Sequence, residues 1–171
     1  QATSATVWTT SKDGGFVTPQ DSWEKFTGQT WAEYKGFGWV DMIHQDDQDR
    51  LVATWKASMS SLDVYNSYGR LWHADSKEYR HLEVHGVPVI VDGELTEWVG
   101  CTIDVQDRRL AEIALHKSER QLRTITDSVP VFISYIDRNY RYQFNNAAYA
   151  DSYELSVEEI KNMTIAELQG D

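Results

Sequence analysis

Residues 65–105 read YNSYGRLWHADSKEYRHLEVHGVPVIVDGELTEWVGCTIDV, and this stretch decides the fold. Polar and apolar side chains alternate in three parts of it with a period of two, which is typical of strands. The predicted strands are residues 65–73, 79–91 and 97–105. Two short polar segments, ADSK and DGE, separate the strands and favour hairpin turns. Three consecutive antiparallel strands are therefore predicted.

The sequence before this stretch predicts two further strands and a layer of helices. Strand-forming residues at 7–9 and at 16–17 flank an Asp-Gly-Gly turn. Thr30 and Glu33 have the spacing of a capping box, and Gly28 and Gly36 are suited to ending short helices. A longer helix begins with acidic residues near Asp46 and carries an apolar stripe. We predict an α+β fold, in which residues 6–105 form one five-stranded antiparallel sheet with the helices of residues 21–62 on one face.

Composition excludes several classes of partner. The chain has 171 residues and a net charge of −11, and it contains no cluster of Lys and Arg for phosphate groups, so neither nucleic acid nor an anionic membrane surface is an expected partner. Cys101 is the only cysteine, which excludes an internal disulfide and favours the cytoplasm. No apolar run is long enough to span a bilayer. Because the chain begins at Gln1, we interpret it as a fragment whose parent protein can still be membrane-anchored.

A charged segment without Gly or Pro follows the last predicted strand. Residues 107–127 are expected to form a connecting helix, in which Leu115, Leu122 and Val129 lie seven positions apart with Ser118 and Ile125 between them. Such spacing indicates a short heptad seam. A single amphipathic connector and a dimeric coiled coil both agree with this pattern, because fewer than about three heptads do not separate them.

The opening pattern of the chain returns after Pro130. Residues 131–137 and 140–144 predict a hairpin, and short helices follow. Tyr149 lies 126 positions after Trp23, and the same offset places Ser156 on Thr30 and Glu159 on Glu33. The repeat contains no gap through these helices and predicts a tandem array.

Residues 23–29, 38–47 and 97–106 read WEKFTGQ, GWVDMIHQDD and EWVGCTIDVQ. They resemble three segments of bacterial PAS sensor domains: W-x-x-F-T-G, G-W-x-x-x-x-H-P-D-D with Gln45 at the usual Pro, and the final strand with its D-I-T signature, here D-V-Q. Residues 118–171 resemble the first half of another PAS unit, with Asn146 at the family's usual Asn. We therefore expect a first PAS sensor domain at 1–106, a connector at 107–127 and the N-terminal half of a second PAS domain at 128–171.

The resemblance implies a sensory and dimerisation module of a bacterial signal-transduction protein. It would relay a stimulus through the connector to an output domain outside the chain, commonly a histidine kinase or a diguanylate cyclase. A structural spacer for protein interactions that binds no ligand stays open as an alternative, and a small-ligand enzyme is a third reading. We expect that the chain itself is not an enzyme, because it contains no phosphate loop and no nucleophile motif.

The resemblance implies a ligand site between the sheet and the helices, and strand alternation together with the resemblance selects candidates for its lining. The candidates are Trp39, Met42, Ile43, Trp55, Ser67, Gly69, Leu71, Leu82 and Val84. Ser67, Gly69 and Gly86 are small and are expected to leave space for a small apolar or aromatic ligand. The opposite interpretation, that aromatic side chains fill this space, is also open. The Asn-Cys-Arg motif for covalent flavin is absent, and the helix of residues 51–62 contains no His for haem.

Two further sets of residues are expected to act in signalling and in contacts with a partner. Asp104, Leu115, Leu122 and Ile125 would carry the signal into and along the connector. Tyr68, Trp72, His81 and His85 would lie on the outer face of the sheet, where aromatic side chains suggest cover by a partner. We expect a homodimer through this face or through the connector helix. Three His residues on these strands could hold zinc, but no metal is expected, since the nearby Cys101 and Glu83 lack a recognisable ligand spacing.

Overall fold

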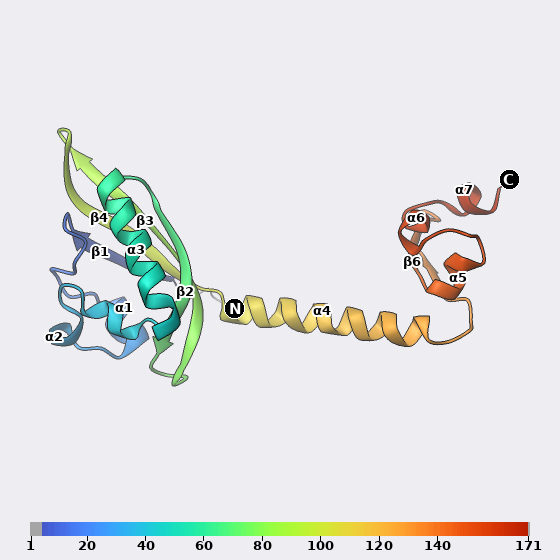
Figure 1. Cartoon of the computed structure of the whole chain (residues 1–171), viewed down its shortest axis with the longest axis horizontal. Coiled ribbons are helices and arrows are strands. Elements are labelled where there is room, and N and C mark those ends of the chain that lie inside the picture. Colours follow the sequence, from blue (N-terminus) through green and yellow to red (C-terminus); the bar gives the residue numbers. More distant parts are fainter. Residues whose placement is uncertain (1–4, 171) are drawn as a thin grey trace. The chain divides into compact units, whose positions relative to one another are not determined.

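The structure is a computed structural model that describes residues 5–170 (Figure 1). Contacts divide the chain between Leu110 and Ala111 into two compact units. Among residues 5–170, none of the helices combines the length and the apolar character that crossing a bilayer requires.

The first unit is built on an antiparallel sheet with the strand order β1-β4-β3-β2. The strands are β1 (Ala5–Ser11), β2 (Tyr65–His73), β3 (Glu78–Val91) and β4 (Glu94–Asp104). The sequence therefore predicted β2, β3 and β4 correctly as consecutive hairpin strands. The N-terminal strand β1 pairs with the last strand, with Trp8 opposite Gly100.

Helices cover one face of this sheet. They are α1 (Asp21–Thr27), α2 (Trp31–Tyr34), the 3₁₀ helix η1 (Gly38–Met42) and α3 (Gln45–Ser61). Figure 1 shows α3 lying against the sheet. Trp23 of α1 and Leu51 and Trp55 of α3 share one buried cluster with Tyr65 and Trp98 of the sheet. The α+β class with its antiparallel sheet and one helical layer is confirmed.

The strand that the sequence predicted around residues 16–17 does not form. Phe16 forms only an isolated antiparallel bridge with Gly36, so the sheet has four strands where five were expected. The turn after β1 closes through two backbone hydrogen bonds, in which Ser11 N donates to Gly15 O and Gly14 N donates to Ser11 O, and it directs the chain toward the α2–η1 loop. Pro19 then has no N–H with which to extend a ladder. The fifth strand is thereby reduced to one pair of residues.

Local signals place the helix ends as expected. The Glu33 carboxylate accepts hydrogen bonds from the Thr30 backbone N–H at 2.7 Å and from its hydroxyl at 2.8 Å. Gly28 ends α1 with φ 77°, a left-handed conformation that glycine adopts without strain. The imidazole of His44 accepts from the Asp46 N–H at the start of α3, which agrees with a capping role.

A 22-residue helix, α4 (Gln106–Asp127), contains the division between the units. The second unit then continues with β5 (Ser134–Ile136), β6 (Tyr142–Asn145), α5 (Ala147–Asp151), α6 (Val157–Ile160) and α7 (Ile165–Gln169). The connecting helix and the hairpin are confirmed, the latter with shorter strands than the sequence predicted. Tyr142, Ala150 and Ile160 form the small core of this unit.

The local structure of the second unit matches that of the first at the 126-residue offset. Gly36 N donates to Phe16 O, and at the same offset Asn162 N donates to Tyr142 O, both at 2.8 Å. The return bond differs, because Phe16 N donates to Gly36 O whereas Tyr142 N donates to Met163 O. The backbone φ is 70° at Gly36 and 69° at Asn162. Ser156 and Glu159 form a capping box at the same offset from that of Thr30 and Glu33. The correspondence is therefore one of hydrogen bonds and backbone conformation as well as of sequence.

Candidate functional site: an aromatic cavity and the junction with helix α4

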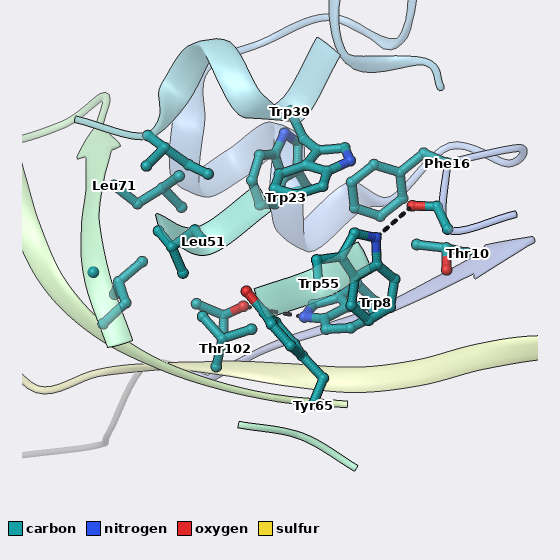
Figure 2. A pocket seen from close by; sticks show the side chains of 15 residues that line it. Trp8, Thr10, Phe16, Trp23, Trp39, Leu51, Trp55, Tyr65, Leu71 and Thr102 are labelled. Atoms are coloured by element: carbon teal, nitrogen blue, oxygen red, sulfur yellow. Dashed lines mark hydrogen bonds between the residues drawn. The ribbon is translucent and has the colours of Figure 1, made fainter. Parts of the chain in front are cut away.

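A cavity lies between the inner face of the sheet and the helices of the first unit (Figure 2). Its volume is about 70 Å³, measured as the space open to the centre of a water molecule. One water needs roughly 10–15 Å³, so the cavity exceeds a single water site several-fold. It is well below the roughly 300–1,000 Å³ of sites for drug-sized ligands.

The structure brings seven of the nine predicted lining residues to this cavity, and two lie elsewhere. The seven are Trp39, Ile43, Trp55, Gly69, Leu71, Leu82 and Val84. Met42 packs half-buried at the edge of the core. Ser67 lies in the edge strand, where Arg50 Nη1 of α3 approaches its hydroxyl at 3.4 Å. These two residues are corrections to the predicted lining.

The expected source of the space was also wrong. A side chain already occupies the volume in front of each glycine: a Cβ atom at Gly69 would lie 2.6 Å from Leu51 Cδ1, and one at Gly86 would lie 2.8 Å from the Trp8 ring. The glycines therefore allow Leu51 and Trp8 to approach the sheet closely. The cavity is what remains between these inserted side chains and the helices.

Eight lining residues were missing from the predicted set: Trp8, Thr10, Gly14, Phe16, Trp23, Leu51, Tyr65 and Thr102. Strand alternation already placed Tyr65 on the inner face, and the helical stripe included Leu51. Nothing local in the sequence reveals that β1 pairs with β4, which is what places Trp8 and Thr102 on the same wall.

Few polar atoms reach the cavity, and most have partners. Trp8 Nε1 donates to Thr102 Oγ1 at 3.1 Å, and Trp55 Nε1 donates to the Gly14 carbonyl at 3.3 Å. Tyr65 is 4% exposed, and burial raises the pKa of its phenol because it disfavours the phenolate. The hydroxyl is therefore neutral and able to donate at physiological pH.

The junction between the sheet and α4 is a second feature of this unit. Arg80 Nε of β3 lies 2.6 Å from Asp104 Oδ2 at the end of β4, and its Nη2 lies 2.8 Å from Asp107 Oδ1 in the first turn of α4. The side chain of Gln106 accepts from the His81 backbone N–H, and Val105 N donates to the His81 carbonyl. The start of α4 is thereby attached to β3.

The predicted partner-face residues are only partly brought together. Tyr68, His81 and His85 line one shallow groove on the outer face of the sheet, whereas Trp72 packs edge-on against Tyr79 outside it. Tyr68 is 65% exposed, with the Arg50 guanidinium 4.4 Å above its ring. Within residues 5–170, no three His, Cys, Asp or Glu side chains converge as metal ligands.

The predicted signalling residues of α4 are solvent-exposed. Leu115, Leu122 and Ile125 are 58%, 56% and 64% exposed. The helix therefore carries an apolar stripe that contacts no core in the described chain.

Comparison with known proteins identifies the family. The family model described as the PAS fold matches residues 16–102, and the chain belongs to this family. A chain from a sensory box histidine kinase/response regulator of Burkholderia thailandensis is 29% identical with a TM-score of 0.50, and the match covers 71% of this chain and 92% of that one. The N-terminal domain of a diguanylate cyclase with PAS/PAC sensor from Marinobacter aquaeolei has a TM-score of 0.53 at 18% identity, covering 61% and 98%. The latter is a likeness of fold.

A curated relative shows that longer proteins contain such a segment. The Sinorhizobium fredii protein y4lL is 30% identical over 126 residues, which are 74% of this chain. The chain spans only 15% of the length of that relative.

Proposed function

We propose that the first unit is a sensory module, whose state is relayed through α4 to an output domain outside this chain. The observation that carries the proposal is the double contact of Arg80 with Asp104 and Asp107. Arg80 and the cavity residues Leu82 and Val84 lie on the same strand, and Leu82 pairs directly with Asp104. A change in the cavity that shifts β3 would therefore shift the first turn of α4.

A histidine kinase is the proposed output domain. The sequence identity of 29% with a sensory box histidine kinase/response regulator chain, in a match that covers 71% of the present chain, supports this choice. A diguanylate cyclase is the second candidate output. In this proposal the chain carries no catalytic role of its own, in keeping with a cavity lined by neutral side chains.

The second unit is proposed to be the first half of another PAS domain. The matched capping boxes and the matched positive φ angles at Gly36 and Asn162 support this proposal. Its two-stranded sheet is too small to be stable on the strength of its own pairing, so further strands or another chain would have to complete it.

We also propose that two copies of the chain associate through α4. The exposed Leu115, Leu122 and Ile125 lie at heptad spacing, which is the geometry of a two-helix seam. In sedimentation velocity, the full chain should be a dimer, and Leu122→Glu should make it a monomer because it places a charge in the seam. Arg123→Glu, one position away and outside the seam, is the control. A chain that is monomeric at high concentration would contradict the proposal.

Hydrogen exchange can test the relay without a ligand. Val84→Phe enlarges a side chain in the cavity, whereas Val87→Phe makes the same change on the exposed outer face. We expect the first change to alter amide exchange across residues 104–127 several-fold and the second to leave it unaltered. Equal exchange in the two variants and in the parent chain would refute a relay from the cavity to α4.

A further inference from the structure

The backbone of His81 joins β3 to the start of α4. Its N–H donates to the Gln106 side chain at 3.0 Å, and its carbonyl accepts from Val105 N at 3.0 Å. The imidazole of the same residue lines the groove on the outer face of the sheet together with Val105 and Arg109. A change in the charge of this imidazole therefore acts where the sheet passes into the helix.

Two arginines from different elements lie near the imidazole. Arg70 is directly opposite His81 in the β2–β3 pairing, and facing residues of such strands have their Cβ atoms about 5 Å apart. Arg109 approaches from the first turn of α4. In the described part of the chain Arg109 forms no ion pair, so no carboxylate neutralises its charge. An imidazolium at position 81 would therefore lie between two cations.

Acidic side chains also lie near His81, but arginines already hold them. Asp47 of α3 accepts from Arg70 Nε at 2.8 Å. Glu83, two positions further along β3, accepts from Arg108 Nη2 of α4. The other titratable groups that line or adjoin the groove are Tyr68, His85 and Asp46. A protonated imidazole would have to compete with an arginine for each of these carboxylates.

These surroundings determine the direction in which pH acts. Burial, followed by the charges of Arg109 and Arg70, lowers the pKa of His81 from its ordinary value of 6.5, against a smaller opposing effect of Asp47. When the first turn of α4 leaves the sheet, Arg109 leaves with it, and the pKa returns toward the ordinary value. A proton therefore binds the open junction more tightly than the closed one. The attachment is complete above about 6.5 and weakens as the pH falls from there toward the lowered value.

We propose that His81 is a proton-sensing site, whose protonation places a cation beside Arg109 and loosens the first turn of α4 from β3. The helix turn is the part that moves, because β3 is paired with a strand on both sides. The regulatory meaning of this site rests on the proposed relay through α4.

Amide hydrogen exchange of the full chain tests the proposal between a pH of about 7.5 and about 5.5. Protection factors are compared, because they remove the intrinsic pH dependence of exchange. The amides of Val105 and Arg109, which donate to the His81 and Val105 carbonyls, should lose protection several-fold at the lower pH. His81→Gln should abolish this loss, since it cannot titrate and keeps both backbone bonds. His85→Gln, on the same face of β3 but hydrogen-bonded to Asn66, is the matched control and should respond like the parent chain.

Arg109→Gln tests the opposing charge. It should raise the pKa of the His81 imidazole in an NMR titration and reduce the loss of protection. Three results would overturn the proposal: no loss in the parent chain, an equal loss in His81→Gln, or a His81 pKa that Arg109→Gln leaves unchanged.

The proton site and the relay can fail separately. A pH response in a chain whose α4 is unaffected by Val84→Phe would retain the proton site and reject the relay from the cavity. An effect of Val84→Phe on α4 without a pH response would reject the proton site and retain the relay.

Discussion

Arg80 Nε lies 2.6 Å from Asp104 Oδ2, and only 9% of the Asp104 side chain is exposed, against 67% for Asp107, the other carboxylate that Arg80 contacts. Solvent screens the exposed pair, which is worth about 0–1 kcal/mol. Breaking a buried pair costs more, about 3–5 kcal/mol, because an unpaired charge remains. Asp104 therefore contributes more than Asp107 to holding the Arg80 side chain in place.

Asp104→Asn should lower the free energy of unfolding of the first unit by about 2 kcal/mol, less than for a fully buried pair because Arg80 is partly exposed. Asp107→Asn, the matched control, should cost less than about 0.5 kcal/mol. Urea unfolding followed by tryptophan fluorescence measures both values in the first unit, since all seven tryptophans lie in residues 8–98. Equal losses in the two variants would contradict this ranking.

Gly100→Ala should destabilise the first unit by about 1–3 kcal/mol or more, because its Cβ would overlap the Trp8 ring and the His85 carbonyl. The backbone oxygen cannot move away as a flexible side chain could. Val7→Ala, at a position 59% exposed on the outer face, is the control and should change stability little. Fluorescence-detected unfolding again provides the measurement, and a fully stable Gly100→Ala variant would show that Trp8 does not lie against the sheet.

Asn146→Ala should destabilise the second unit by at least about 2 kcal/mol. The Asn146 side chain is fully buried; its amide donates to the Thr126 and Val131 carbonyls at 2.8 Å, and its carbonyl accepts from Ile133 N at 3.0 Å. Removing it leaves several buried groups unpaired, each at about 1–3 kcal/mol. Faster amide exchange at residues 126–150 is the expected result, and the exposed Gln143→Ala should behave like the parent chain.

Acid should weaken the first unit through Asp47. Hydrogen bonds from the Arg70 guanidinium, at 2.8 Å for Nε, lower the pKa of Asp47. Stabilisation from a lowered pKa is complete above the unfolded value of about 3.9 and is lost as the pH falls through the folded value. Unfolding of the parent chain should therefore become easier as the pH falls below about 4, and the decrease should be smaller in Asp47→Asn, whose side chain cannot titrate. An identical decrease in both proteins would exclude this carboxylate as its source.

Much of the fold followed from local patterns in the sequence. Period-two alternation predicted residues 65–73, which form β2 with the same ends, and the Thr30–Glu33 spacing predicted a capping box. These signals are local because neighbouring residues produce them. The pairing of β1 with β4 joins residues nearly a hundred positions apart, so no window of the sequence contains it.

The candidate site was predictable to a smaller degree for the same reason. Alternation found the inner-face residues Leu71 and Leu82, but it also selected Ser67, whose hydroxyl accepts a hydrogen bond from Arg50 of α3 and which does not line the cavity. From the sequence, Gly69 and Gly86 predicted empty space above the sheet. In the structure, Leu51 and Trp8 from distant elements fill that space. The side chain that fills the space above a glycine is determined by three-dimensional packing, and the glycine itself does not indicate which side chain that is.

The constant 126-residue spacing means that residues 8–44 and 134–170 are equal in length and begin and end at corresponding points. Segments of this kind can be exchanged without changing the length of any loop. If the second unit is the first half of a PAS domain, as proposed, a chain in which residues 45–105 follow Gly170 should place α3 and the three hairpin strands where the first unit has them. A recombinant hybrid of this kind would show whether the two opening segments are interchangeable.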